Sequence, residues 1–185
     1  MVWSKSVNIK ERPGLNGDLS AETAVIGAGM AGILIASGLQ RAGHDVAVLE
    51  ARRIAGGQTR HTTAKITSQH GLIYSKLIKT LGEEKARQYA EANENAVRAY
   101  RELVRSEGIE CDFEEKDAFL YGDDMGLLTE EAEAAARLGL RASLAGAEKL
   151  PFPAAGAVKF EGQAQFNPLK FIAHVAEPLK IYENT

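Results

Sequence analysis

Residues Ala24–Gly32 read AVIGAGMAG, an apolar run that leads into glycines spaced as G-x-G-x-x-G. This spacing is typical of the turn between a buried parallel strand and the helix of a dinucleotide-binding βαβ unit. Gly27 permits a tight reversal, Gly29 lets the backbone approach a pyrophosphate, and Gly32 lets the helix pack closely on the strand. The first amides of that helix, predicted over Met30–Ala42, lack intrahelical acceptors and therefore suit an anionic diphosphate.

A second predicted strand, Asp45–Glu50, follows the helix and ends in an acid. Glu50 stands where the motif expects a carboxylate that accepts hydrogen bonds from both ribose hydroxyls. A 2′-phosphate would meet like charge there, so NADP is disfavoured as the ligand. The alternative is a βαβ unit whose glycines serve packing alone, but strand, turn, helix, strand and acid occur in the order that dinucleotide binding requires.

The polar segment after Glu50 indicates which dinucleotide is bound. Arg52–Arg60 reads RRIAGGQTR and lies beyond the carboxyl end of the second strand, where a doubly wound sheet presents its ligand; it favours FAD over NAD. The run Ala24–Tyr74 resembles the FAD-binding start of glutathione-reductase-like flavoproteins, in their amino-acid-oxidase-like (DAO-type) branch. Within it, the segment TTAKITSQHGLIY at Thr62–Tyr74 is similar to a subgroup of bacterial and archaeal FAD-dependent oxidoreductases that often carry a C-terminal Rieske domain. The resemblance continues through CDF at 111–113 and FNPLK at 166–170.

The resemblance implies an α/β fold: a Rossmann-like FAD-binding βαβ unit with an inserted α+β substrate lobe. We expect an N-terminal arm at 1–19, the βαβ unit and flavin loop at 20–81, part of the substrate lobe at 82–165, and a return helix at 166–185. Proteins of this type are about twice as long or more, so we expect an N-terminal fragment whose sheet is not completed. A Rieske cluster needs two cysteines and two histidines, and the chain has one cysteine and four histidines.

Hydrophobic periodicity predicts further elements beyond the polar loop. Helices are predicted at Leu72–Leu81, Glu83–Glu107, Thr129–Leu138 and Pro168–Leu179, and extended segments at Glu22–Ile26, Ile109–Phe113, Ala118–Tyr121 and Ala157–Glu161. One face of the long second helix recurs at helical spacing and is predicted to be core rather than cofactor pocket. That face consists of Ala86, Tyr89, Ala90, Ala96, Val97, Tyr100, Leu103 and Val104.

Charge and composition exclude several classes of protein. The 185 residues include 22 Lys and Arg against 25 Asp and Glu, for a net charge of −3, so no basic surface for nucleic acid is expected. No run approaches membrane-spanning length and Met1–Lys5 lacks the apolar core of a secretory signal, so we expect a cytoplasmic protein with no membrane role. The single cysteine, Cys111, excludes an internal disulfide framework and is interpreted as structural, because Glu110 and Asp112 disfavour a thiolate.

The candidate FAD-binding residues gather in the glycine turn, at the end of the second strand and in the polar loop. They are Gly27, Gly29, Met30, Ala31, Gly32, Glu50, Ala51, Arg52, Gly57, Thr59, Thr62 and Thr63. The three threonines have hydroxyls that can donate to phosphate or ribityl groups, and Arg53 or Arg60 can pair with phosphate charge. The alternative for this loop is a solvated turn.

Lys65 and His70 are the candidate catalytic residues. A cation beside the flavin ring would stabilise its anionic reduced form, and a histidine can move a substrate proton. Alternatively, Lys65 pairs with an acid and His70 caps a helix or contacts the backbone. The histidines form no recognisable metal-ligand spacing, so no metal is expected.

Three functions remain open from the sequence. The first is an FAD-dependent oxidoreductase that removes hydride from a small amine or amino-acid-like donor. The second is a flavoprotein that passes electrons to an iron–sulfur domain, and the third is a catalytically silent binding fragment. Because a parallel sheet with only its first strands has an unpaired edge, we also expect self-association into a homo-oligomer or weak stability.

Overall fold

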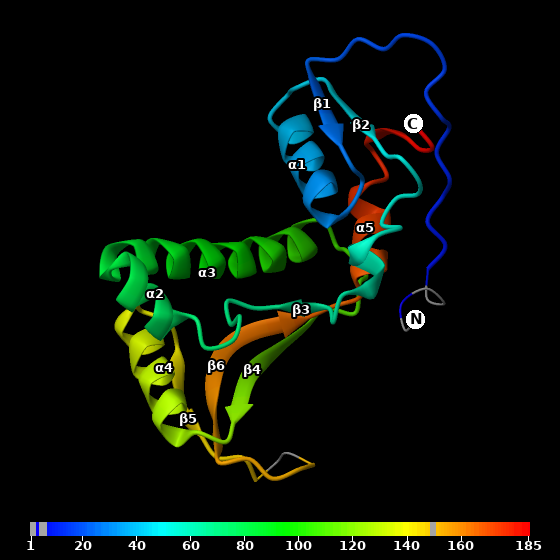
Figure 1. Ribbon diagram of the computed structural model, residues 1–185. Helices are drawn as coiled ribbons and strands as arrows, with labels where there is room; N and C mark the ends of the chain where they lie inside the picture. The colour runs from blue at the N-terminus through cyan, green and yellow to red at the C-terminus, as the bar shows by residue number, and fades with distance from the viewer. Residues whose placement is uncertain (1–2, 4–6, 149–150) are drawn as a thin grey trace. The chain divides into compact units, whose positions relative to one another are not determined.

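The computed structural model describes Trp3 and residues 7–148 and 151–185 (Figure 1). The chain divides into two compact units. The first unit comprises residues 1–64, 108–112 and 166–185, and the second comprises residues 65–107 and 113–165. The functional boundaries expected at residues 19, 81 and 165 stay a prediction, because compact units and functional domains need not coincide. The expectation that Met1–Lys5 is no secretory signal falls almost wholly outside the described residues.

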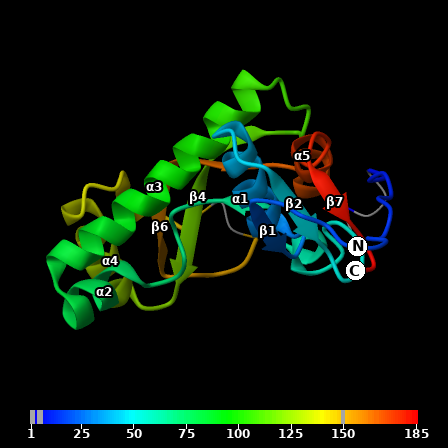
Figure 2. The same ribbon diagram turned by 90° about the horizontal axis from the view of Figure 1, so that it is seen from above.

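The first unit is built on a three-stranded parallel sheet. Its regular elements are β1 (Thr23–Ile26), α1 (Met30–Arg41), β2 (Val46–Leu49), α5 (Pro168–Val175) and β7 (Lys180–Tyr182). The strand order is β1-β2-β7, and Figure 2 shows the three strands side by side. Val48 is fully buried and pairs with both Val25 and Ile181. The α/β fold with a parallel βαβ unit, predicted from the sequence, is confirmed.

The edge formed by β1 is unpaired within the described part of the chain. There β1 pairs with β2 alone. Ile26, the last residue of β1, is 78% exposed, although strands of parallel sheets normally have both faces covered. The open edge therefore combines unpaired backbone groups with an exposed apolar side chain.

The return to the parallel sheet differs in detail from the sequence prediction. Asn167 caps α5 by accepting the amides of Leu169 and Lys170 at 3.1 and 3.2 Å, and Pro168 suits the first helical turn. The helix ends at Val175 and not near Leu179, because Pro178 cannot continue it. The short strand β7 is an addition to the predicted elements.

The second unit is an antiparallel sheet with three helices. Its elements are β3 (Lys65–Ile66), α2 (Tyr74–Leu81), α3 (Glu83–Ser106), β4 (Glu114–Gly122), α4 (Met125–Arg137), β5 (Ala142–Ala145) and β6 (Gly156–Gln165). The long strand β6 pairs with β4, β5 and β3. Side chains of α2, α3, α4 and β6 form one apolar core, in which Tyr74 and Phe160 are fully buried.

Three local predictions for the middle of the chain are wrong. Ile109–Phe113 is not a strand, because Asp112 adopts a left-handed conformation with φ of 53°. Helix α4 begins at Met125, four residues before Thr129, because the Asp124 carboxylate accepts the amide of Leu127 and caps the helix there. Ala96 is exposed, whereas the predicted core face of α3 includes buried Ala86, Ala90, Val97 and Val104.

No helix among the described residues is long and apolar enough to cross a membrane. Cys111 is buried, and its carbonyl accepts the amide of Asn167 at 2.6 Å. These contacts agree with a structural role for the cysteine.

Candidate dinucleotide-binding site

The glycine turn has the geometry that its sequence requires. Gly27 has a φ of 97°, a left-handed conformation that side-chain-bearing residues rarely adopt. A Cβ on Gly32 would lie 1.9 Å from the carbonyl oxygen of Gly27, so only glycine lets α1 start this close to β1. A Cβ on Gly29 would meet Thr59 Oγ1 at 3.5 Å, which is ordinary contact, so the protein itself tolerates a side chain there.

The N-terminus of α1 presents backbone amides to the same place. The first backbone bond of the helix runs from the amide of Ile33 to the carbonyl of Gly29 at 3.0 Å, so the amides of Ala31 and Gly32 precede the helical ladder. The amide of Met30 donates to Thr59 Oγ1 at 3.0 Å. This hydroxyl, on a residue only 8% exposed, therefore covers one of the free amides at the positive end of the helix.

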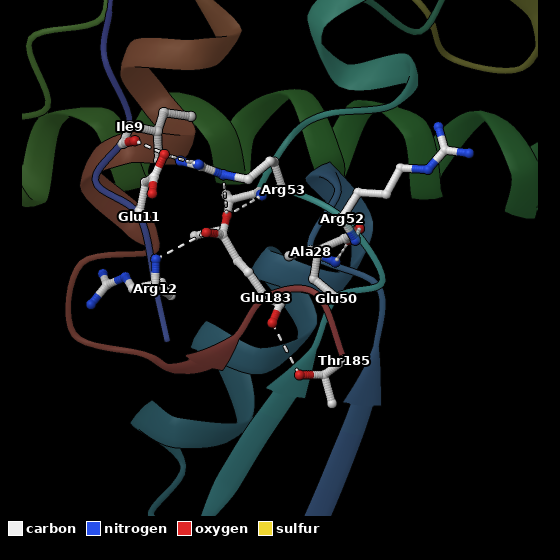
Figure 3. Close-up of polar contacts among 10 residues, drawn as sticks. Ile9, Glu11, Arg12, Ala28, Glu50, Arg52, Arg53, Glu183 and Thr185 are labelled. Carbon is white, nitrogen blue, oxygen red and sulfur yellow. Dashed lines mark hydrogen bonds and ion pairs between the residues drawn. The ribbon is translucent and has the colours of Figure 1, made fainter. Parts of the chain in front are cut away.

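Glu50 lies at the end of β2 and faces the glycine turn, as Figure 3 shows. Its Oε2 accepts the amide of Ala28 and its Oε1 accepts the amide of Arg52, both at 2.8 Å. The carboxylate therefore fixes the turn and the following loop relative to each other. Each carboxylate oxygen can accept a second hydrogen bond, so acceptor sites remain for ribose hydroxyls.

These groups line one cleft of about 640 Å³ in the first unit. Its walls are Ile26, Gly27, Gly29, Met30, Ala31, Gly32, Glu50, Ala51, Arg52, Gly56, Gly57, Gln58 and Thr59. Ten of the twelve candidate FAD-binding residues are in this set, so the structure brings them together around one cleft. Ile26, Gly56 and Gln58 are additions; the last two belong to the polar loop that the sequence pattern singled out.

The structure does not bring Thr62 and Thr63 to the walls of this cleft. Both are exposed. Thr62 Oγ1 accepts the amide of Ala64 at 3.2 Å, and the Thr62 carbonyl accepts the indole N–H of Trp3 at 3.0 Å. Their contact with FAD stays a prediction.

The two arginines considered for phosphate pairing have different partners. Arg53 pairs with Glu11 and with Glu183, and its hydrogen bond to Glu11 is the main reason that its pKa is raised. Arg53 is therefore engaged by protein carboxylates. Within the described residues, the Nε of Arg60 is buried without a hydrogen-bond partner, which leaves this guanidinium with an unused donor.

The candidate catalytic residues lie in the second unit. Lys65 is exposed on β3, where it pairs with Gln165 of β6. His70 is exposed, and its Nε2 lies 3.2 Å from Asn93 Oδ1. Their catalytic roles stay predictions. No group of three or more His, Cys, Asp or Glu residues in the described part of the chain could hold a metal ion.

The cleft in the first unit fits the diphosphate and ribose of a dinucleotide. Gly29 has no Cβ where the backbone lines the cleft, and the amides at the start of α1 are donors. Glu50 adds a carboxylate whose two oxygens retain free acceptor sites.

Two relatives resemble the chain in sequence. The chain is 34% identical to a protein of Bacillus subtilis (strain 168) whose provisional name is Rieske 2Fe-2S iron-sulfur protein YhfW, over 99% of the chain and 38% of that protein. It is 28% identical to gamma-glutamylputrescine oxidoreductase of Escherichia coli (strain K12), over 64% of the chain and 28% of that enzyme. The chain thus spans well under half the length of both relatives.

Solved structures share the fold. The L-proline dehydrogenase from P. horikoshii has a TM-score of 0.70 at 20% identity, covering 94% of the chain and 45% of that protein. An L-amino acid deaminase from Proteus myxofaciens has a TM-score of 0.69 at 20% identity, covering 97% and 41%. The glycine oxidase from Bacillus cereus ATCC 14579 has a TM-score of 0.59 at 18% identity, covering 89% and 46%.

The family model described as DAO, FAD dependent oxidoreductase, matches residues 22–184, nearly the whole chain. This match includes the glycine turn, Glu50 and the loop that together line the cleft. The chain therefore belongs to the DAO family of FAD-dependent oxidoreductases.

Proposed function

We propose that this chain is the FAD-binding portion of an oxidoreductase that removes hydride from a small amine or amino-acid-like donor. The observation that carries the proposal is the cleft at the N-terminus of α1, where Gly29, Glu50 and Thr59 meet. The names of its relatives, among them a gamma-glutamylputrescine oxidoreductase and a glycine oxidase, support this class of donor.

In this proposal, the amides of Met30, Ala31 and Gly32 hold the diphosphate, and Glu50 accepts the ribose hydroxyls. Thr59 Oγ1 already accepts from Met30 and retains its own O–H to donate to a phosphate oxygen. Bound FAD supplies the hydride acceptor, while the protein binds and orients it. Lys65 is the proposed cation beside the flavin ring.

His70 is the proposed proton carrier, because a histidine side chain can move a substrate proton and this one is exposed, with its Nε2 3.2 Å from Asn93 Oδ1.

FAD retention tests the proposal directly. The purified protein is mixed with FAD, unbound flavin is removed, and the visible absorbance of the retained flavin is measured. We expect retention by the wild type. The change Gly29→Val should lower the affinity by about tenfold or more, the equivalent of 1.4 kcal/mol, because its side chain would occupy the space of the diphosphate.

A matched glycine variant within α1, the helix that follows Gly29, provides the control. A Cβ on Gly38 meets no atom within 4 Å, and Gly38 does not line the cleft. Gly38→Val should therefore retain FAD like the wild type. Equal FAD affinity in the Gly29→Val protein and the wild type would remove the basis of the assignment.

A second candidate function, electron transfer to an iron–sulfur domain, is supported by the 34% identity to YhfW, which is named for a Rieske cluster. The DNA sequence that follows the coding region of this chain distinguishes the two candidate functions. A following segment with two cysteines and two histidines at Rieske spacing would support electron transfer. A reduced flavin that oxygen reoxidises rapidly in the longest gene product would instead support an oxidase.

The third candidate is a binding fragment without activity. It predicts FAD retention with no reduction of the flavin by any amine or amino acid. Turnover by the 185-residue protein would exclude it.

A further inference from the structure

Glu183 is a buried carboxylate that the proposed FAD contacts do not use. It follows β7, and its side chain is 1% exposed. Its Oε1 accepts the amide of Ile54 at 2.7 Å and the Nε of Arg53 at 3.1 Å, and its Oε2 accepts the amide of Arg12 at 2.9 Å. Figure 3 shows this carboxylate between the loop that carries Arg53 and the N-terminal arm.

The groups that Glu183 holds lead directly to the dinucleotide cleft. Ile54 is buried, and the next amide in the chain, that of Ala55, donates to the carbonyl of Ala28 in the glycine turn at 2.9 Å. The amide of Gly56 then donates to the carbonyl of Arg53 at 2.9 Å, and Gly56 starts the wall of the cleft that runs to Thr59. The loop is thus tied to Glu183 on one side and to the glycine turn on the other.

The N-terminal arm completes the surroundings of Glu183. The backbone amide of Glu183 donates to the carbonyl of Pro13 at 3.1 Å. The guanidinium of Arg12 donates to the carbonyls of Ala176 and Glu177, each at 3.0 Å, just beyond the end of α5. Arg53 also pairs with Glu11 of the arm. The arm therefore shields the carboxylate and supplies one of its donors.

We propose that Glu183 is a positioning residue, which fixes the loop segment 53–55 so that the next residues, Gly56–Thr59, form one wall of the dinucleotide cleft. The role of that wall in FAD binding rests on the proposed function. Glu183 itself does not line the cleft, so it acts through the backbone of Ile54 and Ala55.

The requirement for a carboxylate follows from the three donors that surround it. A glutamine at this position has one oxygen and one NH₂ group. If the oxygen stays on Ile54 and Arg53, the NH₂ group faces the amide of Arg12, and donor meets donor. If the side-chain amide of the glutamine is instead rotated by half a turn, its NH₂ group faces Ile54, and the buried backbone amide of Ile54 loses its acceptor. Either arrangement releases one of the two segments that Glu183 joins.

Glu131 offers a matched control in the second unit. It is also fully buried and accepts three backbone amides, those of Ile73, Tyr74 and Ser75 at the start of α2. Glu131→Gln therefore removes the same chemistry from the same degree of burial, but it leaves the loop of the cleft unchanged.

The experiment measures backbone amide exchange in FAD-free protein for the wild type, Glu183→Gln and Glu131→Gln, followed by the Kd for FAD. We expect exchange at Ile54 and Ala55 to become about tenfold faster in Glu183→Gln, and the Kd for FAD to rise by about tenfold, which corresponds to 1.4 kcal/mol. In Glu131→Gln the faster exchange should appear at Ile73 and Tyr74, with an unchanged Kd.

The readouts separate the two proposals. If the wild type does not bind FAD, the proposed function fails for this chain, while the exchange of Ala55 still decides the role of Glu183. Unchanged exchange at Ala55 in Glu183→Gln would overturn the positioning role, and so would an equal rise of Kd in both glutamine variants. If Glu183→Gln does not fold, Glu183→Asp, which keeps the charge but shortens its reach, is read by the same two measurements.

Discussion

Each of the two units contains a buried glutamate whose carboxylate accepts backbone amides, but the segments that donate these amides differ in structure. Glu131 in the second unit accepts the amides of Ile73, Tyr74 and Ser75 and thereby caps the regular helix α2. Glu183 in the first unit accepts the amides of Ile54 and Arg12, which belong to irregular segments. The regular helix keeps its own hydrogen-bond ladder, whereas the irregular segments of the first unit depend on partners far away in the sequence.

This contrast accompanies the position of the candidate dinucleotide cleft in the first unit. The cleft of the first unit is lined by a turn and a loop, whose shape is set by single contacts such as those of Glu50. The second unit is held by a continuous apolar core around Tyr74 and Phe160. The first unit should therefore be the more sensitive of the two to single backbone substitutions.

The largest expected effect comes from Gly32→Ala in α1. Its Cβ would lie 1.9 Å from the carbonyl oxygen of Gly27, a backbone atom that cannot yield without moving the strand or the helix. We expect a loss on the order of 3–5 kcal/mol in the free energy of unfolding of the first unit. Amide exchange should accelerate at Val48 and much less at Phe160 of the second unit.

The same substitution elsewhere in the helix checks the cause. Gly38→Ala places its Cβ in open space and should stabilise α1 by up to about 1 kcal/mol, because alanine favours the helix over glycine. A similar stability of the Gly32→Ala and wild-type proteins would contradict the close approach on which the cleft depends.

The sequence was sufficient wherever a short local pattern dictates backbone geometry. Gly27 and Gly32 are predictable because the left-handed φ of Gly27 and the close approach of Gly32 to the strand require glycine, and Glu50 is predictable because it ends a strand at the spacing of the motif. The amphipathic spacing of α3 likewise identifies most of its buried face.

What the sequence could not provide are contacts between distant residues and single-residue exceptions. Glu183 reaches Ile54 across 129 positions, and no local pattern marks that pair. Thr59 could be predicted as a hydroxyl donor, but not as the acceptor for the amide of Met30. The alternation around Asp112 resembles a strand, yet one left-handed residue ends it.

A smaller effect tests the core of the second unit through pH. Burial is the main cause that raises the pKa of Tyr74 above its ordinary value of 10.0, and its hydroxyl donates to the buried carbonyl of Ser68. The folded state therefore favours the neutral phenol. This contribution to stability is fully present below pH 10 and is lost as the pH rises through the raised pKa.

Tyr74→Phe should cost about 1 kcal/mol at pH 7 through the lost hydrogen bond. Above pH 10 its unfolding free energy should fall less steeply than that of the wild type. Part of the slope remains, because burial also raises the pKa of Tyr100. Denaturant unfolding between pH 8 and pH 11 measures both slopes, and parallel slopes would exclude Tyr74 as a source of the alkaline loss.

The smallest expected effect on stability belongs to the open edge of the first unit. Ile26 is 78% exposed at the end of β1, which among the described residues pairs on one side alone. Ile26→Lys should change the free energy of unfolding by no more than about 0.5 kcal/mol, since surface substitutions rarely do more. It should, however, weaken self-association, because a charge on an exposed strand opposes edge-to-edge pairing.

Sedimentation velocity over a range of protein concentrations measures this association. Leu81→Lys provides the control. Leu81 is the last residue of α2 in the second unit, its side chain is apolar and 52% exposed, and it does not lie on a strand edge. If the edge drives association, the Ile26 variant shifts toward monomer and the Leu81 variant sediments like the wild type. Equal shifts in both variants would assign the association to general surface hydrophobicity, and a wild type that is monomeric at every concentration would show that the open edge does not pair by itself.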